Sequence, residues 1–140
     1  MTTAQWAAPS SAQTMITTEA NSLATAGTTA LGTAWDNTST RYVQCAGEVY
    51  LASLTPASGG YVQVYLVPAP DGTNYGDAGV NSNLVATIYP STSASAKRLM
   101  FENVPMGPFL YKVALKNVTG VTLAASGNTV KLWGMEGENV

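Results

Sequence analysis

The chain has 140 residues, of which 46% are hydrophobic and 10% are charged, and its formal net charge is −2. A chain of this length forms one domain whose core needs no metal or disulfide, and its charged fraction lies far below the roughly 25% typical of soluble domains. The six basic residues are scattered, which argues against nucleic-acid binding, and the absence of histidine removes the commonest general base, so we expect no enzyme and no cofactor.

The first residues differ in pattern from the rest. Residues 1–12 show no hydrophobic periodicity, so they are predicted to be a flexible arm preceding a single domain at residues 13–140. They contain no basic cluster and no long apolar run, so we expect neither a secretory signal nor a membrane span, and synthesis in a cytoplasm. Trp6 is a candidate anchor on a partner. The alternative is that Trp6 folds back on its own domain.

From residue 13 onward, short runs rich in Val, Leu, Tyr and Thr alternate with clusters of Gly, Pro, Asn and Ser. This pattern is typical of β-strands joined by turns. A helical turn is expected only within residues 19–26. The predicted strands, about eight in number, cover residues 13–18, 28–35, 41–54, 61–68, 84–89, 97–101, 109–117 and 130–135.

Alternation within these runs predicts which side chains point inward. Glu48, Tyr50 and Tyr65 alternate with the apolar residues of their strands, so they are expected on the faces exposed to water. Short antiparallel strands with one apolar face each predict an all-β fold, an antiparallel β-sandwich of jelly-roll or immunoglobulin-like type. The predicted core positions are Val43, Cys45, Val49, Leu51, Val62, Val64, Leu66, Val113 and Leu115. In that setting Cys45 is a buried structural thiol.

The turns predict how the strands connect. Residues 56–60 (PASGG) favour a hairpin, and Asn37 and Asn117, which each begin an Asn-X-Ser/Thr pattern, are interpreted as turn residues. The segment 68–83 is too long and too rich in Gly and Asn for a tight turn. We therefore predict an exposed loop that contacts a partner.

This loop also holds a candidate metal site. Oxygen-bearing side chains of Asp71, Asn74 and Asp77 could converge on a calcium ion, although their spacing is not that of an EF-hand. The alternative is ordinary turn chemistry, in which Asp and Asn bond to nearby backbone groups. Tyr75 is a candidate contact residue, together with Asp71, Asn74 and Asp77, or else it closes over the sandwich. The other Tyr and Trp side chains resemble core packing more than a sugar-binding platform.

Several turn motifs resemble small proteins encoded among the head genes of tailed bacteriophages. They are TTEANSL (17–23), DNT (36–38), PASGGYV (56–62), PDGTNY (70–75), NVTG (117–120) and ASGNT (125–129), spread over residues 15–133. The resemblance implies a virion structural protein on the capsid surface, a capsid decoration (cement) protein bound to the major capsid protein. It also implies association with further copies of itself, for example as a trimer. The alternative is a tail or fibre module that binds a receptor or glycan.

Overall fold

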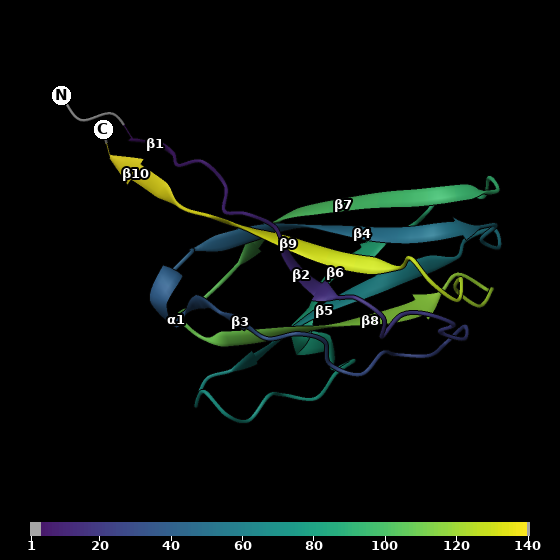
Figure 1. Ribbon diagram of the computed structural model, residues 1–140, viewed down its shortest axis with the longest axis horizontal. Coiled ribbons are helices and arrows are strands. Elements are labelled where there is room, and N and C mark those ends of the chain that lie inside the picture. The colour runs from purple at the N-terminus through teal and green to yellow at the C-terminus, as the bar shows by residue number, and fades with distance from the viewer. Residues whose placement is uncertain (1–3, 140) are drawn as a thin grey trace.

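The computed structural model describes residues 4–139 and consists of two four-stranded antiparallel sheets packed face to face (Figure 1). The β4 sheet has the strand order β2-β9-β4-β7, and the β5 sheet has the order β3-β8-β5-β6. The strands of the β4 sheet are β2 (Gln13–Ile16), β9 (Thr129–Met135), β4 (Gln44–Leu54) and β7 (Ser95–Pro105). Those of the β5 sheet are β3 (Trp35–Asp36), β8 (Leu110–Val118), β5 (Tyr61–Ala69) and β6 (Leu84–Ile88).

The chain changes sheet at nearly every connection. From β2 to β9, only the step from β5 to β6 stays within one sheet. Eight strands in these two orders form a jelly roll, which confirms the predicted β-sandwich and selects between the two types considered. A further pair, β1 (Ala4–Trp6) and β10 (Gly137–Asn139), lies outside the sandwich.

Two local predictions were wrong. Residues 56–60 do not form a hairpin, because they lead from β4 to β5, which belong to different sheets. In the predicted strand 28–35, Thr28 makes one isolated bridge to Lys116, and regular pairing begins only at Trp35. Turn composition marks where a chain reverses but not which strand it pairs with next.

Helical turns also occur outside the predicted segment. They are α1 (Asn37–Thr40) and η1 (Asn81–Asn83), whereas residues 19–26 form non-helical turns. At α1 the Asp36 side chain accepts a hydrogen bond from the Thr38 N–H (2.8 Å), which satisfies one of the unpaired amides at a helix start. A one-turn helix has no hydrophobic period, so only its capping residue could have indicated it.

The space between the sheets is the main core. Of the predicted core residues, Cys45, Val49, Leu51, Val62, Val64, Leu66, Val113 and Leu115 are buried. Val43 is 58% exposed, so its assignment was wrong. It precedes the first residue of β4, and parity alone does not show where a strand begins or leaves the core.

A second apolar cluster lies on the outer face of the β5 sheet. Tyr65, Val67 and Ala114 are buried there. They are covered by Leu31 from the segment before β3 and by Tyr75 from the loop between β5 and β6. The prediction that Tyr65 faces water was therefore wrong, because the chain's own loops cover this face.

Three buried asparagines connect the loops to the strands. Asn37, Asn117 and Asn128 are each 0% exposed. The Asn117 amide donates to the Leu23 and Val121 carbonyls (2.9 and 2.8 Å), and its Oδ1 accepts from the Thr119 N–H (3.0 Å). Asn117 lies in β8, one residue before its end, and its bond to the Thr119 N–H is the local side-chain bond expected of a turn residue. Such fully bonded buried amides hold loop and strand in one geometry.

Candidate interaction surfaces

The two ends of the described chain form a ribbon that extends from one end of the sandwich (Figure 1). β1 and β10 pair antiparallel, with Trp6 opposite Gly137. The pairing continues toward the sandwich, because the Ala7 N–H donates to the Glu136 carbonyl (3.0 Å) and the Ser10 N–H to the Gly134 carbonyl (2.9 Å). The predicted arm is therefore paired from residue 4 to residue 10. Its flexibility stays a prediction.

The Trp6 side chain is exposed on this ribbon. It is 62% exposed, and with Val43, Gln5 and Gly137 it lines an open, mainly apolar hollow of about 420 Å³. Val43 belongs to the chain just before β4, so the hollow lies at the junction of ribbon and sandwich. The core cluster does not include Trp6, so the folding back of Trp6 on its own domain, which was the alternative considered, reaches no further than this hollow beside Val43.

The loop between β5 and β6 is held by Asp71. Its Oδ1 accepts from the Thr73 and Asn74 N–H groups (2.9 and 2.7 Å), and its Oδ2 accepts from the Asn74 side-chain amide (2.7 Å). Hydrogen bonds from Asn74, followed by that from Thr73, lower the pKa of Asp71 to about 2. Both carboxylate oxygens are thus engaged in a local turn.

Of the three calcium candidates, Asp71 and Asn74 bond to each other. Asp77 is joined to the loop through its carbonyl oxygen, which accepts from the Asn83 amide (3.2 Å), and it makes none of the bonds to Asp71. Among the described residues, no three or more His, Cys, Asp or Glu side chains are grouped so that they could hold a metal ion. This geometry fits the turn interpretation of the loop.

Tyr75 closes over the β5 sheet. It is half-buried against the outer cluster, and the Lys112 ammonium lies 4.6 Å from the centre of its ring. A cation over an aromatic face is attracted by the ring's negative charge density. Tyr75 thus serves its own domain, which was the second of the two roles considered from the sequence.

Among the described residues, no buried apolar cluster lies on the outer face of the β4 sheet. Met100 is 58% exposed there, and with Ala46, Phe101 and Glu102 it lines a shallow hollow of about 340 Å³. By register, Ala46 lies opposite Trp133, which is half-buried. This bare face was not singled out from the sequence, although the outward parity of β4 and β9 would have marked it.

A carboxylate lies near the middle of the bare face. Glu48 is 6% exposed and its Oε2 lies 2.7 Å from the Arg98 guanidinium, which is itself mostly exposed and lies over the Tyr50 ring. The prediction that Glu48 is solvated was wrong. Long neighbouring side chains can cover a charge with their aliphatic parts even on an open sheet face.

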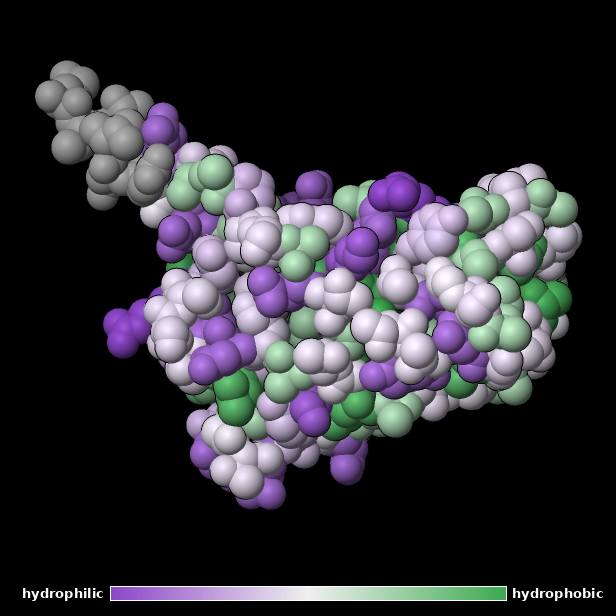
Figure 2. All heavy atoms as spheres, in the orientation of Figure 1, coloured by the Kyte–Doolittle hydropathy of each residue, from purple (hydrophilic) through white to green (hydrophobic). Residues whose placement is uncertain are grey.

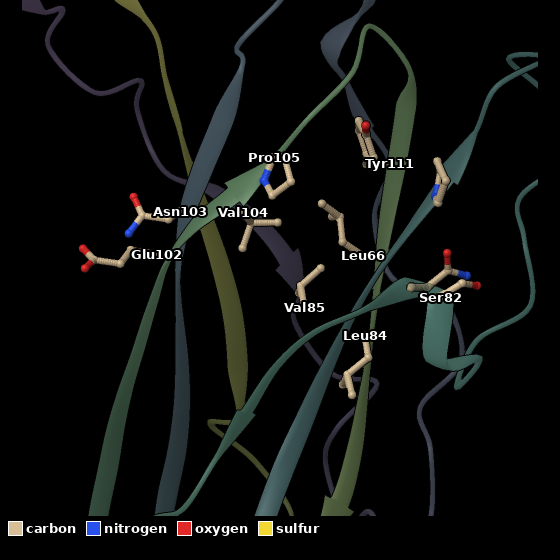
Figure 3. A pocket seen from close by; sticks show the side chains of 11 residues that line it. Leu66, Ser82, Leu84, Val85, Glu102, Asn103, Val104, Pro105 and Tyr111 are labelled. Atoms are coloured by element: carbon tan, nitrogen blue, oxygen red, sulfur yellow. The ribbon is translucent and has the colours of Figure 1, made fainter.

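A cleft opens between β6 and β7, the strands at one edge of each sheet (Figure 3). Its volume is about 410 Å³, and Leu66, Val104 and Tyr111 form its floor. Asn103 has φ 58° at a bulge in β7, and in Figure 3 its side chain and that of Glu102 point away from the floor. Ser82, Asn83, Glu102 and Asn103 also line the cleft, so it is not the predominantly apolar pocket typical of small-ligand sites.

Cys45 does not form a reactive site. It is 0% exposed, and burial raises the pKa of its thiol to about 12. The thiolate is the nucleophilic form, so a thiol with this pKa is inert near neutral pH. The structure thus agrees with a structural role for Cys45.

Much of the surface shown in Figure 2 is pale, which means neither strongly hydrophilic nor strongly hydrophobic. In the part of the chain that the structure describes, no helix has the length and apolar character needed to cross a membrane. Comparison with protein-family models, with curated proteins and with solved structures found no match. A functional proposal therefore has to come from the surfaces of this molecule.

Proposed function

We propose that this chain is a non-enzymatic virion structural protein, a capsid decoration protein that binds the outer surface of the major capsid shell. The observation that carries the proposal is the ribbon of β1 and β10, which extends from a rigid jelly roll and exposes Trp6 and Val43. The turn motifs that resemble phage head proteins support it, as does the low charged fraction of the chain. Jelly rolls occur in viral capsid proteins but also in lectins, so the fold alone does not decide.

The ribbon suits attachment for a physical reason. Two short strands without a third are only marginally stable in water, so contact with a partner stabilises them. An exposed indole gains more than most side chains when a partner buries it. A surface with few charges is covered with little loss of charge hydration. Many copies bound to one shell add their individual contacts, which strengthens the assembly.

Cryo-electron microscopy of the intact particle tests the location. Under the proposal, density that fits the jelly roll lies over the shell, with the ribbon against the major capsid protein. Density at the tail instead would contradict the capsid role. The same map shows whether the copies form trimers.

A binding titration tests the role of the ribbon. Trp6→Ala should weaken attachment to particles by about 30-fold or more, the loss expected for a central aromatic contact. Met100→Ala, which removes an exposed apolar side chain from the bare face, is the matched control. Both variants should unfold at the same urea concentration as the parent chain. Equal occupancy for the parent chain and Trp6→Ala at limiting protein concentration would rule out the ribbon as the contact.

A second candidate is a tail or fibre module that binds a glycan, and one observation favours it. Tyr89 is 65% exposed, and its ring lies 5.4 Å from that of Tyr61. Exposed aromatic rings offer an apolar face to a sugar at low entropic cost. Binding of host-surface glycans that is lost in Tyr89→Ala and retained in Trp6→Ala would favour this candidate over the capsid role.

A further inference from the structure

Lys97 is a buried cation, and the structure shows no carboxylate paired with it. The residue is 4% exposed, on the inward parity of β7 and opposite Leu51 of β4. None of the carboxylates whose side chains the structure describes forms an ion pair with its ammonium. Lysine is almost never fully buried unless it is paired, because its charge loses hydration.

Three serines surround this ammonium. Nζ donates to the hydroxyls of Ser91 (3.2 Å), Ser93 (3.1 Å) and Ser95 (3.0 Å) and to the Ser93 carbonyl. The serines themselves are exposed, so they form a layer of hydroxyls between the buried charge and water. The oxygens are neutral, and the positive charge of the site is left without a counterion.

The arrangement of hydroxyl protons leaves a donor directed outward. Nζ carries three protons for four acceptor oxygens, so its hydrogen bonds are shared among them, and a serine hydroxyl that accepts from Nζ directs its own proton elsewhere. Two contacts join neighbouring hydroxyls, Ser91 to Ser93 at 3.0 Å and Ser93 to Ser95 at 3.3 Å. Three hydroxyl protons serve two such contacts, so at least one proton is free to donate to a group outside the loop. Hydrogen bonding to a cation makes a hydroxyl a stronger donor.

We propose that the serine loop over Lys97 (residues 91–95) is an anion-binding site that takes a phosphate, sulfate or carboxylate group. The hydroxyls touch the anion, and the buried ammonium supplies the charge behind them. This site is independent of the capsid role. It lies in the connection between β6 and β7, whereas the proposed attachment lies on the ribbon of β1 and β10.

A purely structural role for Lys97 is the competing explanation, in which the lysine only ties the loop to β7. The two explanations differ in one measurable property. A structural tie gives no saturable response to anions, whereas an anion that binds the folded state raises the thermal midpoint by mass action. Phosphate and sulfate also stabilise folded proteins generally, so the comparison has to be made between variants.

The test uses inorganic phosphate, sulfate and acetate, each against sodium chloride at equal ionic strength. NMR of the full chain should show saturable shifts of the backbone amides of residues 91–97 with at least one of the three. Ser93→Ala combined with Ser95→Ala should weaken that binding by about tenfold or more, as expected for lost bonds to a charged group. Lys116→Met, which removes a charge from β8 in the other sheet, is the control that retains the binding.

The three anions also distinguish the class of ligand. A response to phosphate or sulfate identifies a tetrahedral oxyanion, and a response to acetate alone identifies a carboxylate. Lys97→Met should abolish binding where it folds; where it does not fold, the double serine variant decides. No saturable shift at residues 91–97 with any anion, or full binding by the double serine variant, overturns the proposal.

Discussion

The two sheets of this jelly roll differ in what lies over their outer faces. On the β5 sheet, Leu31 and Tyr75 arrive from two loops and bury Tyr65 and Val67. On the β4 sheet, the corresponding face leaves Met100 exposed. Both sheets have the same number of strands and share one core. The difference shows that loops, and not strand patterns, decide which face of a sandwich is available to a partner.

The largest effect on stability is expected at Asn117, whose side chain ties neighbouring loops to β8. Asn117→Ala should lower the free energy of unfolding by about 3 kcal/mol, because it removes the hydrogen bonds to the Leu23 and Val121 carbonyls and leaves the buried Thr119 N–H without its acceptor. Urea denaturation measures it. Asn81→Ala, which changes an exposed asparagine of η1, is the control. A loss below about 1 kcal/mol would mean that water replaces these bonds and that the loop is not held by Asn117.

A matched pair of truncations tests the comparison directly. Tyr75→Ala should cost about 1–2 kcal/mol, since it uncovers the outer cluster of the β5 sheet and removes the ring beneath the Lys112 ammonium. Met100→Ala on the bare face should cost less than about 0.5 kcal/mol. Both are measured by chemical denaturation under identical conditions. Equal losses would show that the two faces do not differ in cover.

The ion pair on the bare face should respond unequally to removal of its two partners. Arg98→Ala leaves the carboxylate of Glu48, which is 8% exposed, without its partner and should cost about 1–2 kcal/mol. Glu48→Gln leaves an Arg98 side chain that is 67% exposed and remains hydrated, so it should cost less than about 1 kcal/mol. Thermal denaturation of both variants at low salt gives the comparison. The opposite order would mean that water hydrates Glu48 better than its burial indicates.

The smallest effect concerns how Asp71, in the loop between β5 and β6, makes the stability of the folded state depend on pH. Hydrogen bonds lower the pKa of Asp71 from 3.8 to about 2. A carboxyl with a depressed pKa in the folded state contributes stability above its unfolded pKa, and that contribution is lost as the pH falls from 3.8 through about 2. Carbon-13 NMR of the Asp71 carboxyl, followed as the pH is lowered, measures the pKa of Asp71 in the folded state.

In Asn74→Ala the pKa of Asp71 should rise part of the way toward its usual value, because the hydrogen bond from the Asn74 side chain is lost while the larger contribution, the bond from the Asn74 backbone N–H, remains. Asn81→Ala in the same loop should leave it unchanged. A pKa of Asp71 that does not respond to the loss of Asn74 would show that the turn is held in another way.

The sequence by itself determined the all-β class and most of the main core. Strand alternation is a local property, so Val49, Leu51, Val64 and Val113 could be assigned inward without knowledge of their partners. The turn chemistry of Asp71 was also available, because its partners lie within three residues.

The tertiary structure decided everything that depends on distant parts of the chain. Residues 56–60 carry turn signals whether β4 and β5 pair or face each other, and only the packed sheets select the second arrangement. Tyr65 is buried by Tyr75 and Leu31 from loops that no strand period predicts. The pairing of β1 with β10 joins the two ends of the described chain. Long-range contacts of this kind depend on shape and on several segments at once, and a local pattern in the sequence does not contain them.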